Sequence, residues 1–173
     1  MKLINRIATA LCLVTMVFSL TSCLKDDPVV EWDQMKSVIE LPYNRHYLSY
    51  SKLVPGDIQP FDLMVNYTIP YASDNYEDIV VNLGVDESLV DEYNSTLSSH
   101  SKKYVLLPSS ACNLPSQITI LKGTRLWKQE IQVDTKDLEP GVYYLLPIVI
   151  KSVPEPYIIS GNYGHLFVRI KMQ

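Results

Sequence analysis

The feature that most constrains the fold is an alternation of apolar and polar side chains along several short segments. The clearest example places five apolar side chains on one face of an extended chain: Phe61, Leu63, Val65, Tyr67 and Ile69. A period of two residues over this length is typical of a half-buried β-strand. Because each such strand must bury its apolar face, several of them together predict packed sheets.

Similar extended segments recur along the chain, and proline, glycine or short polar turns separate them. Their number and spacing predict an all-β protein, a β-sandwich of about seven strands with one short helix. The expected extended segments are Met35–Leu41, Phe61–Ile69, Ile79–Val85, Tyr104–Leu107, Gln117–Leu121, Trp127–Val133, Val142–Ile150 and His165–Met172, whereas Tyr43–Gln59 is expected to be mainly loop.

Two segments depart from simple alternation. From Asp86 to Leu97 the apolar residues follow a helical period, which predicts a short helix with Asp86 as its N-cap. The run Val142–Ile150 is apolar on both faces, which indicates a strand that is central or covered twice. Because proline cannot donate a ladder hydrogen bond, we expect Pro147 within this run to lie at a bulge or at the sheet's edge.

The amino terminus has the layout of a secretory signal. A short positive stretch, Met1 to Arg6, precedes an apolar run from Ile7 to Leu20. That run is shorter than the roughly 20 apolar residues that a membrane-spanning helix needs. The sequence Leu20-Thr21-Ser22-Cys23 resembles the bacterial lipobox. We therefore expect residues 1–22 to be removed and Cys23 to carry lipid, which anchors a protein stably when two or more acyl chains are attached.

The residues after Cys23 indicate where the anchored protein is sent. Lys25, Asp26 and Asp27 resemble the export signal of Bacteroidetes surface lipoproteins, in which a lysine precedes two acidic residues. The resemblance implies the outer membrane, with the protein facing the cell exterior. We expect residues 23–34 to form a flexible polar tether and residues 35–173 to form the β-sandwich domain.

Composition argues against nucleic-acid binding and against an internal disulfide. Removal of 22 of the 173 residues leaves 151, with 13 basic and 19 acidic residues and a net charge near −6. No basic cluster remains in the sequence to neutralise phosphates, which argues against nucleic-acid binding. Cys112 is the one cysteine left besides Cys23, so no internal disulfide is expected. We interpret Cys112 as a buried small apolar residue, since a nucleophile would need a nearby histidine and an activating environment.

A family resemblance is carried by four blocks: Val85 to Asn94, Leu106-Leu107-Pro108, Ile118 to Gly123 and Tyr143 to Ile148. They resemble one Bacteroidetes family, the immunoglobulin-like amino-terminal domain of unknown function found in many surface lipoproteins. The resemblance covers roughly residues 36–172 and implies an immunoglobulin-like sandwich. In that family the domain often precedes glycan-binding modules or domains like family-18 glycoside hydrolases, encoded with polysaccharide-uptake systems. Members usually carry a further carboxy-terminal domain, whereas the match here ends with the chain, so this domain is expected to have its own task or to act beside partners.

The titratable residues do not predict catalysis, a metal site or a cofactor. His46, His100 and His165 are far apart in sequence and have no cysteine or carboxylate at ligand spacing, so we interpret them as surface or turn histidines. Adjacent acidic pairs such as Asp86-Glu87 and Asp91-Glu92 are typical of solvated turns and helix surfaces. No family catalytic residue can be transferred, and we expect a protein that is not an enzyme.

The aromatic composition is the one feature that points to binding. There are twelve tyrosines and only three phenylalanines. A tyrosine combines a flat apolar face with a polar tip and suits exposed recognition surfaces, where sugar rings stack through their C–H groups. If the loops that carry them meet at one end of the sandwich, five tyrosines are candidate glycan contacts: Tyr43, Tyr47, Tyr50, Tyr157 and Tyr163.

Two functional classes remain open. The first is a non-catalytic surface lipoprotein that contributes to glycan binding or capture, beside the membrane components of a polysaccharide-uptake system. It predicts exposed loop aromatics next to polar groups. The second is an accessory or assembly protein that docks on other outer-membrane proteins without binding glycan. It predicts an exposed sheet edge or a broad apolar patch.

Overall fold

The computed structural model describes residues 36–43, 46–68 and 77–173, and Met35–Gln173 form one compact unit. The expected signal segment, Cys23, the export residues Lys25, Asp26 and Asp27, and the tether lie outside the described residues, as does the end of the strand predicted to reach Ile69. No helix within the described ranges is long and apolar enough to cross a membrane.

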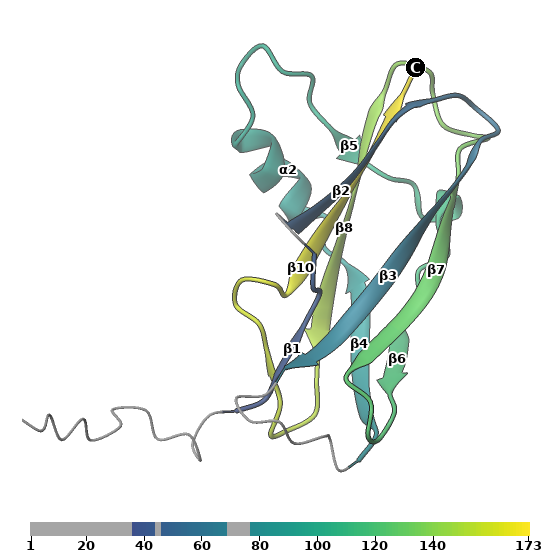
Figure 1. Ribbon diagram of the computed structural model, residues 1–173. Helices are drawn as coiled ribbons and strands as arrows, with labels where there is room; N and C mark the ends of the chain where they lie inside the picture. The colour runs from purple at the N-terminus through teal and green to yellow at the C-terminus, as the bar shows by residue number, and fades with distance from the viewer. Residues whose placement is uncertain (1–35, 44–45, 69–76) are drawn as a thin grey trace, which may run out of the picture. The chain divides into compact units, whose positions relative to one another are not determined.

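Two β-sheets pack face to face and form a β-sandwich, which confirms the predicted fold class (Figure 1). The described residues contain ten strands where about seven were expected, together with one α-helix and one 3-10 turn. The four-stranded sheet has the order β7-β3-β1-β9: β7 (Leu126–Asp134), β3 (Ile58–Thr68), β1 (Val38–Glu40) and β9 (Ile158–Ile159). The six-stranded sheet has the order β2-β10-β8-β4-β6, and β5 also pairs with β8: β2 (Tyr47–Leu53), β10 (His165–Met172), β8 (Tyr143–Ser152), β4 (Ile79–Val85), β6 (Gln117–Ile120) and β5 (Val105–Leu106).

The core fills the space between the sheets with the apolar faces of alternating strands. Leu63 and Val65 of β3 and Val168 and Ile170 of β10 have no solvent-exposed surface. Full burial of such a side chain contributes about 1.5–3 kcal/mol, so the alternation that predicted these strands is also the main source of stability.

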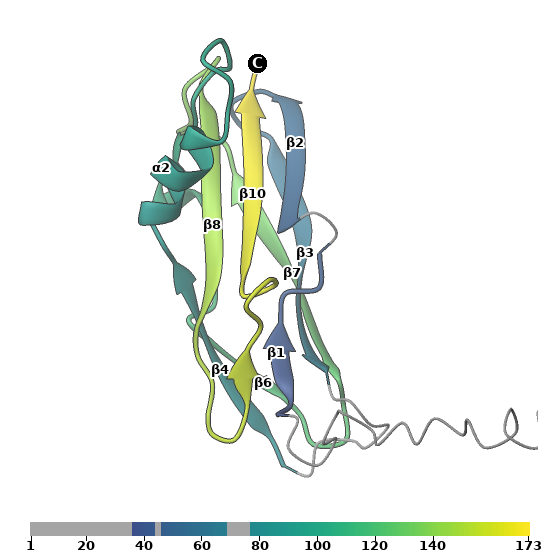
Figure 2. The ribbon, with the colours of Figure 1, turned by 90° about the vertical axis from the view of Figure 1, so that its left-hand side faces the viewer.

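A second apolar cluster covers the outer face of the six-stranded sheet. Helix α2 (Ser88–Ser95) lies over β8 in Figure 2, and its Val90 packs with Tyr104 on Leu145, which is fully buried. Ile148, on the inner face of the same strand, is also fully buried. The prediction that this strand is covered on both faces is therefore confirmed.

The prediction for Pro147 is wrong, because the residue lies in the central strand β8 and is paired with Phe167 of β10. On the opposite side of β8, the β4 ladder ends at Ile148 and the β5 ladder ends at Leu145. Pro147 falls in the gap between these two ladders, where its carbonyl accepts the N–H of Asp86 at 3.1 Å. On this side of β8 no strand is paired with Pro147, so the lack of an N–H in proline costs the sheet no ladder hydrogen bond.

The predicted loop at Tyr43–Gln59 is also wrong in part, because it contains strand β2 and the start of β3. β2 is an edge strand that pairs in parallel with β10, and the register shifts between Lys171 and Met172. Lys52 takes a left-handed φ of 64° at this irregularity. Leu48 and Tyr50 pack against the core before the bulge, and Leu53 does so after it. Because the bulge adds one residue, the core-facing residues of β2 no longer alternate with a period of two in the sequence.

The predicted N-cap of the helix is displaced by one residue. Glu87 occupies the N-cap position of α2 and makes no capping bond with its side chain. The Asp86 carboxylate instead accepts hydrogen bonds from the backbone N–H and the hydroxyl of Ser88, at 3.1 and 2.7 Å. These bonds lower the pKa of Asp86 and satisfy a donor of the first turn.

Candidate functional site

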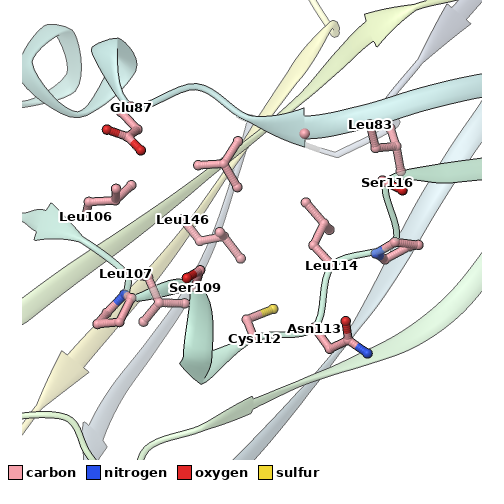
Figure 3. Close-up of a pocket in the computed structure, with 14 residues that line it drawn as sticks. Leu83, Glu87, Leu106, Leu107, Ser109, Cys112, Asn113, Leu114, Ser116 and Leu146 are labelled. Carbon is pink, nitrogen blue, oxygen red and sulfur yellow. The ribbon is translucent and has the colours of Figure 1, made fainter.

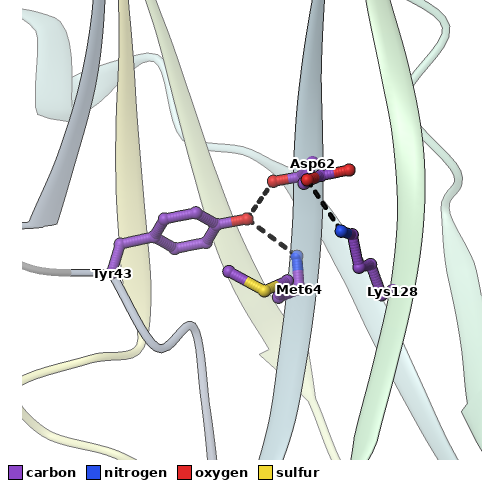
Figure 4. A network of polar contacts seen from close by, with 4 residues as sticks. All are labelled: Tyr43, Asp62, Met64 and Lys128. Carbon is purple, nitrogen blue, oxygen red and sulfur yellow. Dashed lines mark hydrogen bonds and ion pairs between the residues drawn. The ribbon is translucent and has the colours of Figure 1, made fainter.

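The five candidate tyrosines do not meet in one patch, and Tyr43 is the clearest departure. This residue is only 7% exposed, and the part that reaches the surface lines a hollow of about 270 Å³ together with Tyr163. The Tyr43 hydroxyl donates to the backbone carbonyl of Asp62 and accepts the N–H of Met64 at 2.8 Å (Figure 4). Burial raises the pKa of Tyr43 to about 12.

The role of Tyr43 follows from the end of a strand ladder. β1 pairs with β3 up to the pair of Glu40 and Asn66, so the next antiparallel partner of Met64 would be residue 42. That residue is Pro42, and the β1 ladder stops before it, so the Met64 N–H and the Asp62 carbonyl have no partner from strand β1. The Tyr43 hydroxyl supplies both a donor and an acceptor to the backbone of β3 at this point, and thereby replaces one step of the ladder.

Tyr50 and Tyr157 are half-buried and belong to the interior of the sandwich. Tyr50 is paired with Ile170, an inward residue of β10, and packs against the core. The ring of Tyr157 meets that of Tyr67 edge-on, with 5.8 Å between centroids. Burial raises the pKa of both candidate tyrosines, Tyr50 and Tyr157.

Tyr47, in contrast, lies on the outer face of the six-stranded sheet, and Tyr163 lies in the turn that precedes β10. Tyr47 of β2 is in register with Phe167 of β10, an outward residue, and the guanidinium carbon of Arg169 lies 3.6 Å from the Tyr47 ring centroid. Tyr163 is 39% exposed, and its ring stacks on that of His46 with 4.6 Å between centroids.

Tyr163 is one end of a continuous line of rings, which we call the outer-face row, and Tyr47 lies beside this line in register with Phe167. Neighbouring ring centroids along it are 4.6, 5.5, 5.0, 5.1, 5.4 and 5.5 Å apart. In Figure 2, β10 faces the viewer between β2 and the helix over β8. The row comprises, in order, Tyr163, His46, His165, Phe167, Tyr93, Tyr104 and Tyr143.

Two histidines that the sequence indicated to be separate surface residues are neighbours in the row. The rings of His46 and His165 stack with 5.5 Å between centroids, and His46 has a left-handed φ of 60°. Burial, together with His46, lowers the pKa of His165. His100 is exposed and contacts Ser99. Within the described ranges, no three histidine, cysteine or acidic side chains gather as metal ligands would.

A separate cavity of about 480 Å³ opens where β4 and β5 separate along β8 (Figure 3). Its wall is mainly apolar, with Leu83, Leu106 and Leu146 among the lining residues. Cys112 lies at its edge, and burial raises the pKa of the thiol to about 11. A thiol with a raised pKa is a poor nucleophile, which agrees with the structural interpretation of Cys112.

Sequence analysis missed most of the outer-face row. In the last strand the even-numbered residues are buried, so the odd-numbered residues, which include His165 and Phe167, lie on the outer face. The outward apolar face of β8 was also visible in the sequence at Tyr143. The missing information was that His46 and Tyr93, from distant segments, complete the row across β10.

Comparison with known proteins identifies the domain. A family model described as an N-terminal domain matches residues 39–156, more than half of the chain. No curated protein matches the sequence of this chain.

Solved structures from Bacteroides share the fold. A proposed carbohydrate-binding protein from Bacteroides ovatus is 20% identical, with a TM-score of 0.58, over 78% of this chain and 37% of that one. A two-domain protein of unknown function from Bacteroides fragilis is 19% identical, with a TM-score of 0.62, over 82% and 47%. EndoBT-3987 of Bacteroides thetaiotaomicron, solved with a Man5GlcNAc product, is 14% identical, with a TM-score of 0.52, over 73% and 28%.

The present chain thus spans less than half the length of each of these three structures. At these identities the likeness establishes the fold and no more, whereas the family match covers the sequence itself. Together with the motifs noted in the sequence, the match shows that the chain belongs to the Bacteroidetes family of immunoglobulin-like amino-terminal domains of unknown function.

Proposed function

We propose that this chain is a non-catalytic lipoprotein of the outer-membrane surface that binds glycan through its outer-face row. The observation that carries the proposal is the row itself, an unbroken line of rings that ends at the exposed Tyr163. A saccharide chain presents successive C–H faces, and a line of rings offers it successive stacking partners.

The packing of the rings favours binding energetically. Tyr163 is exposed, Tyr104 is buried and supports its neighbours, and the other five rings of the row are half-buried. Each ring is held by the next at 4.6–5.5 Å. A ring that is already fixed loses little side-chain entropy when a ligand stacks on it. The apolar cavity beside β5 suits a sugar less well, because a saccharide needs polar groups and flat faces rather than leucine side chains.

The comparisons support a role connected with glycans. One structural neighbour is a proposed carbohydrate-binding protein, and another was solved with an oligosaccharide product. Both are longer than the present chain, so their whole activities are not transferred to it.

The described titratable groups also support a non-catalytic role. A glycosidase needs a carboxylic acid with a raised pKa beside a second carboxylate. The pKa of Asp86 is lowered by Ser88, and Asp78 accepts the backbone N–H of Lys122 at 2.8 Å. These two carboxylates have structural partners in a turn and at a helix terminus.

Calorimetric titration of a soluble Asp27–Gln173 chain against host and plant glycans tests the proposal. Tyr163→Ala removes the most exposed ring of the row and should weaken binding by about tenfold, which corresponds to about 1.4 kcal/mol. Tyr157→Ala is a matched control, because that tyrosine lies outside the row against Tyr67. Equal effects of the two substitutions, or no saturable binding by the folded domain, would contradict the proposal.

The anchor is tested separately in cells. A clickable fatty acid should label the chain, and Cys23→Ser should abolish the label. External protease should digest the protein on intact cells, and alanine at Lys25, Asp26 and Asp27 together should protect it. Labelling that persists without Cys23 would refute the anchor, and digestion that persists in the triple variant would refute the export signal.

A second candidate function is accessory docking on another outer-membrane protein, and the cavity beside β5 favours it. Its apolar wall has the size of a site for apolar side chains of a partner. Leu106→Asp would place a charge at this wall while the outer-face row remains intact. Loss of a stable complex in this variant, with glycan binding absent in all variants, would favour docking over glycan capture.

A further inference from the structure

One end of the outer-face row carries three positive charges, which we call the basic cluster: Lys102, Arg169 and Lys171. They line a hollow of about 270 Å³ together with Tyr93, Tyr104 and Tyr143 of the row. Leu97 and Ser101 complete the lining, and no acidic residue contributes to it.

The pairing of β10 with β8 determines the position of two of the three cations. Arg169 and Lys171 are outward residues of β10, and they stand opposite Leu145 and Tyr143 of β8. The Lys171 ammonium lies 5.4 Å from the Tyr143 ring centroid. Lys102 approaches the same ring at 5.0 Å and donates a hydrogen bond to the carbonyl of Gly141.

Arg169 is held between two aromatic residues. One terminal nitrogen of its guanidinium donates to the Tyr93 hydroxyl at 3.0 Å, and the group stacks on the Tyr47 ring. Its Nε is buried and has no hydrogen-bond partner within the described structure. A planar guanidinium fixed in this way is suited to bind a carboxylate or a sulfate group.

The charges of the basic cluster are not neutralised by the protein. In the part of the chain that the structure describes, the ion pairs join Lys128 to Asp62 and Lys136 to Asp134, and none involves the cluster. The whole sequence has a formal net charge of −4, so a group of three unpaired cations is unexpected on its surface. Like charges held together repel one another, and a bound anion relieves this repulsion.

We propose that the ligand of the outer-face row is an acidic glycan, whose uronate or sulfate groups bind the basic cluster while its sugar rings stack on the partly exposed rings of Tyr93 and Tyr143. This inference rests on the proposed glycan-binding function and specifies its ligand class. The juxtaposition of cations and ring faces favours an acidic sugar over an acidic peptide, because a peptide would use the charges and leave the ring faces without C–H partners.

The experiment compares ligands that differ only in charge. Oligogalacturonate is titrated beside its methyl ester, and a heparin oligosaccharide beside its desulfated form, with polyglutamate and phosphatidylglycerol vesicles as non-glycan anions. The protein is the soluble Asp27–Gln173 chain, which contains the whole compact unit. The variants are Lys102→Gln with Lys171→Gln, the two single variants of this pair, and Lys122→Gln, which matches each single variant in loss of charge and lies after edge strand β6.

The expected result is that an acidic glycan binds about tenfold or more tightly than its neutral form. The double lysine variant should lose that advantage, and Lys122→Gln should keep it. Affinity should also fall with added salt, because the Debye length shortens from about 10 Å at 0.1 M to about 3 Å at 1 M.

Other outcomes separate the two proposals. Equal binding of charged and neutral glycans, unchanged in the double lysine variant, would overturn the acidic ligand and leave glycan binding in place. Polyglutamate or vesicles that bind as tightly as the acidic glycan would overturn it as well, since charge alone would then explain binding. No binding of any glycan by the folded chain would overturn the proposed function together with this inference.

Discussion

The substitution Tyr43→Phe tests whether a buried hydroxyl replaces a strand partner at the end of β1. The change keeps the ring, which is 7% exposed, and removes the bonds to the Asp62 carbonyl and the Met64 N–H. Leaving a buried backbone donor or acceptor without a partner costs about 1–3 kcal/mol. We therefore expect the free energy of unfolding, measured with urea at neutral pH, to fall by about that amount.

The pH dependence gives this prediction a second, independent signature. The folded-state pKa of Tyr43, about 12, lies above its ordinary value of 10, so the folded chain favours the neutral phenol. The raised pKa therefore stabilises the folded chain fully below pH 10. This stabilisation is lost as the pH rises from 10 to 12, and its loss lowers the free energy of unfolding by up to about 2.7 kcal/mol for two pKa units. The variant lacks it, so the difference in stability between wild type and Tyr43→Phe should shrink over this interval.

Tyr163→Phe is the matched control, since it removes a hydroxyl from the exposed tyrosine of the row. Its effect on stability should stay within about 0.5 kcal/mol. A Tyr43→Phe variant as stable as this control, or a stability difference from wild type that stays constant between pH 8 and pH 12, would refute the ladder role of Tyr43.

Three further predictions concern other parts of the fold. The Asn94 amide bonds both backbone groups of Tyr104 at 2.8 Å, so Asn94→Ala should cost about 1–3 kcal/mol in urea unfolding and speed hydrogen exchange at the Tyr104 amide. The pKa of His165 is lowered by burial and by His46, and the charge of Glu92 opposes this shift. The neutral imidazole therefore adds to the free energy of unfolding above pH 6.5, and this stabilisation is lost as the pH falls below 6.5. In His165→Phe the free energy of unfolding should fall less steeply below pH 6.5 than in wild type. An equally steep fall in the variant would argue against a neutral His165. The thiolate fraction of Cys112 is about a hundredfold below that of an ordinary thiol, because its pKa is about 11 rather than 9. Ellman's reagent should therefore react far more slowly with Cys112 in the native chain than in urea.

Local alternation predicted the strands that supply the core, and the structure shows why it failed elsewhere. The apolar positions of β3, β4 and β10 were identified because each strand buries one complete face. β2 was missed because its bulge at Lys52 breaks the period and because its partner β10 lies at the other end of the chain. Such long-range pairing leaves no trace in the residues nearby.

The candidate site was harder to predict than the fold for the same reason. The bias toward tyrosine was correctly recognised, but the sequence could not distinguish a ring that repairs a ladder, as Tyr43 does, from one on the surface. The outer-face row depends on His46 and Tyr93 reaching β10 from two separate segments. Only the sheet order brings these residues together.

Strand β10 links the stability of this domain to its proposed binding surface. Its even-numbered residues from Leu166 to Met172 fill the core, and its odd-numbered residues carry part of the row and two cations of the basic cluster. A register slip of one residue would exchange the two faces, so burial of the even set also fixes the surface set in place. Substitution of Lys171 should therefore alter binding with little loss of stability, whereas substitution of Arg169 also removes its contacts with Tyr93 and Tyr47. Phe167 is the exception, because it also packs in the apolar cluster under α2, so its removal should weaken binding and folding together.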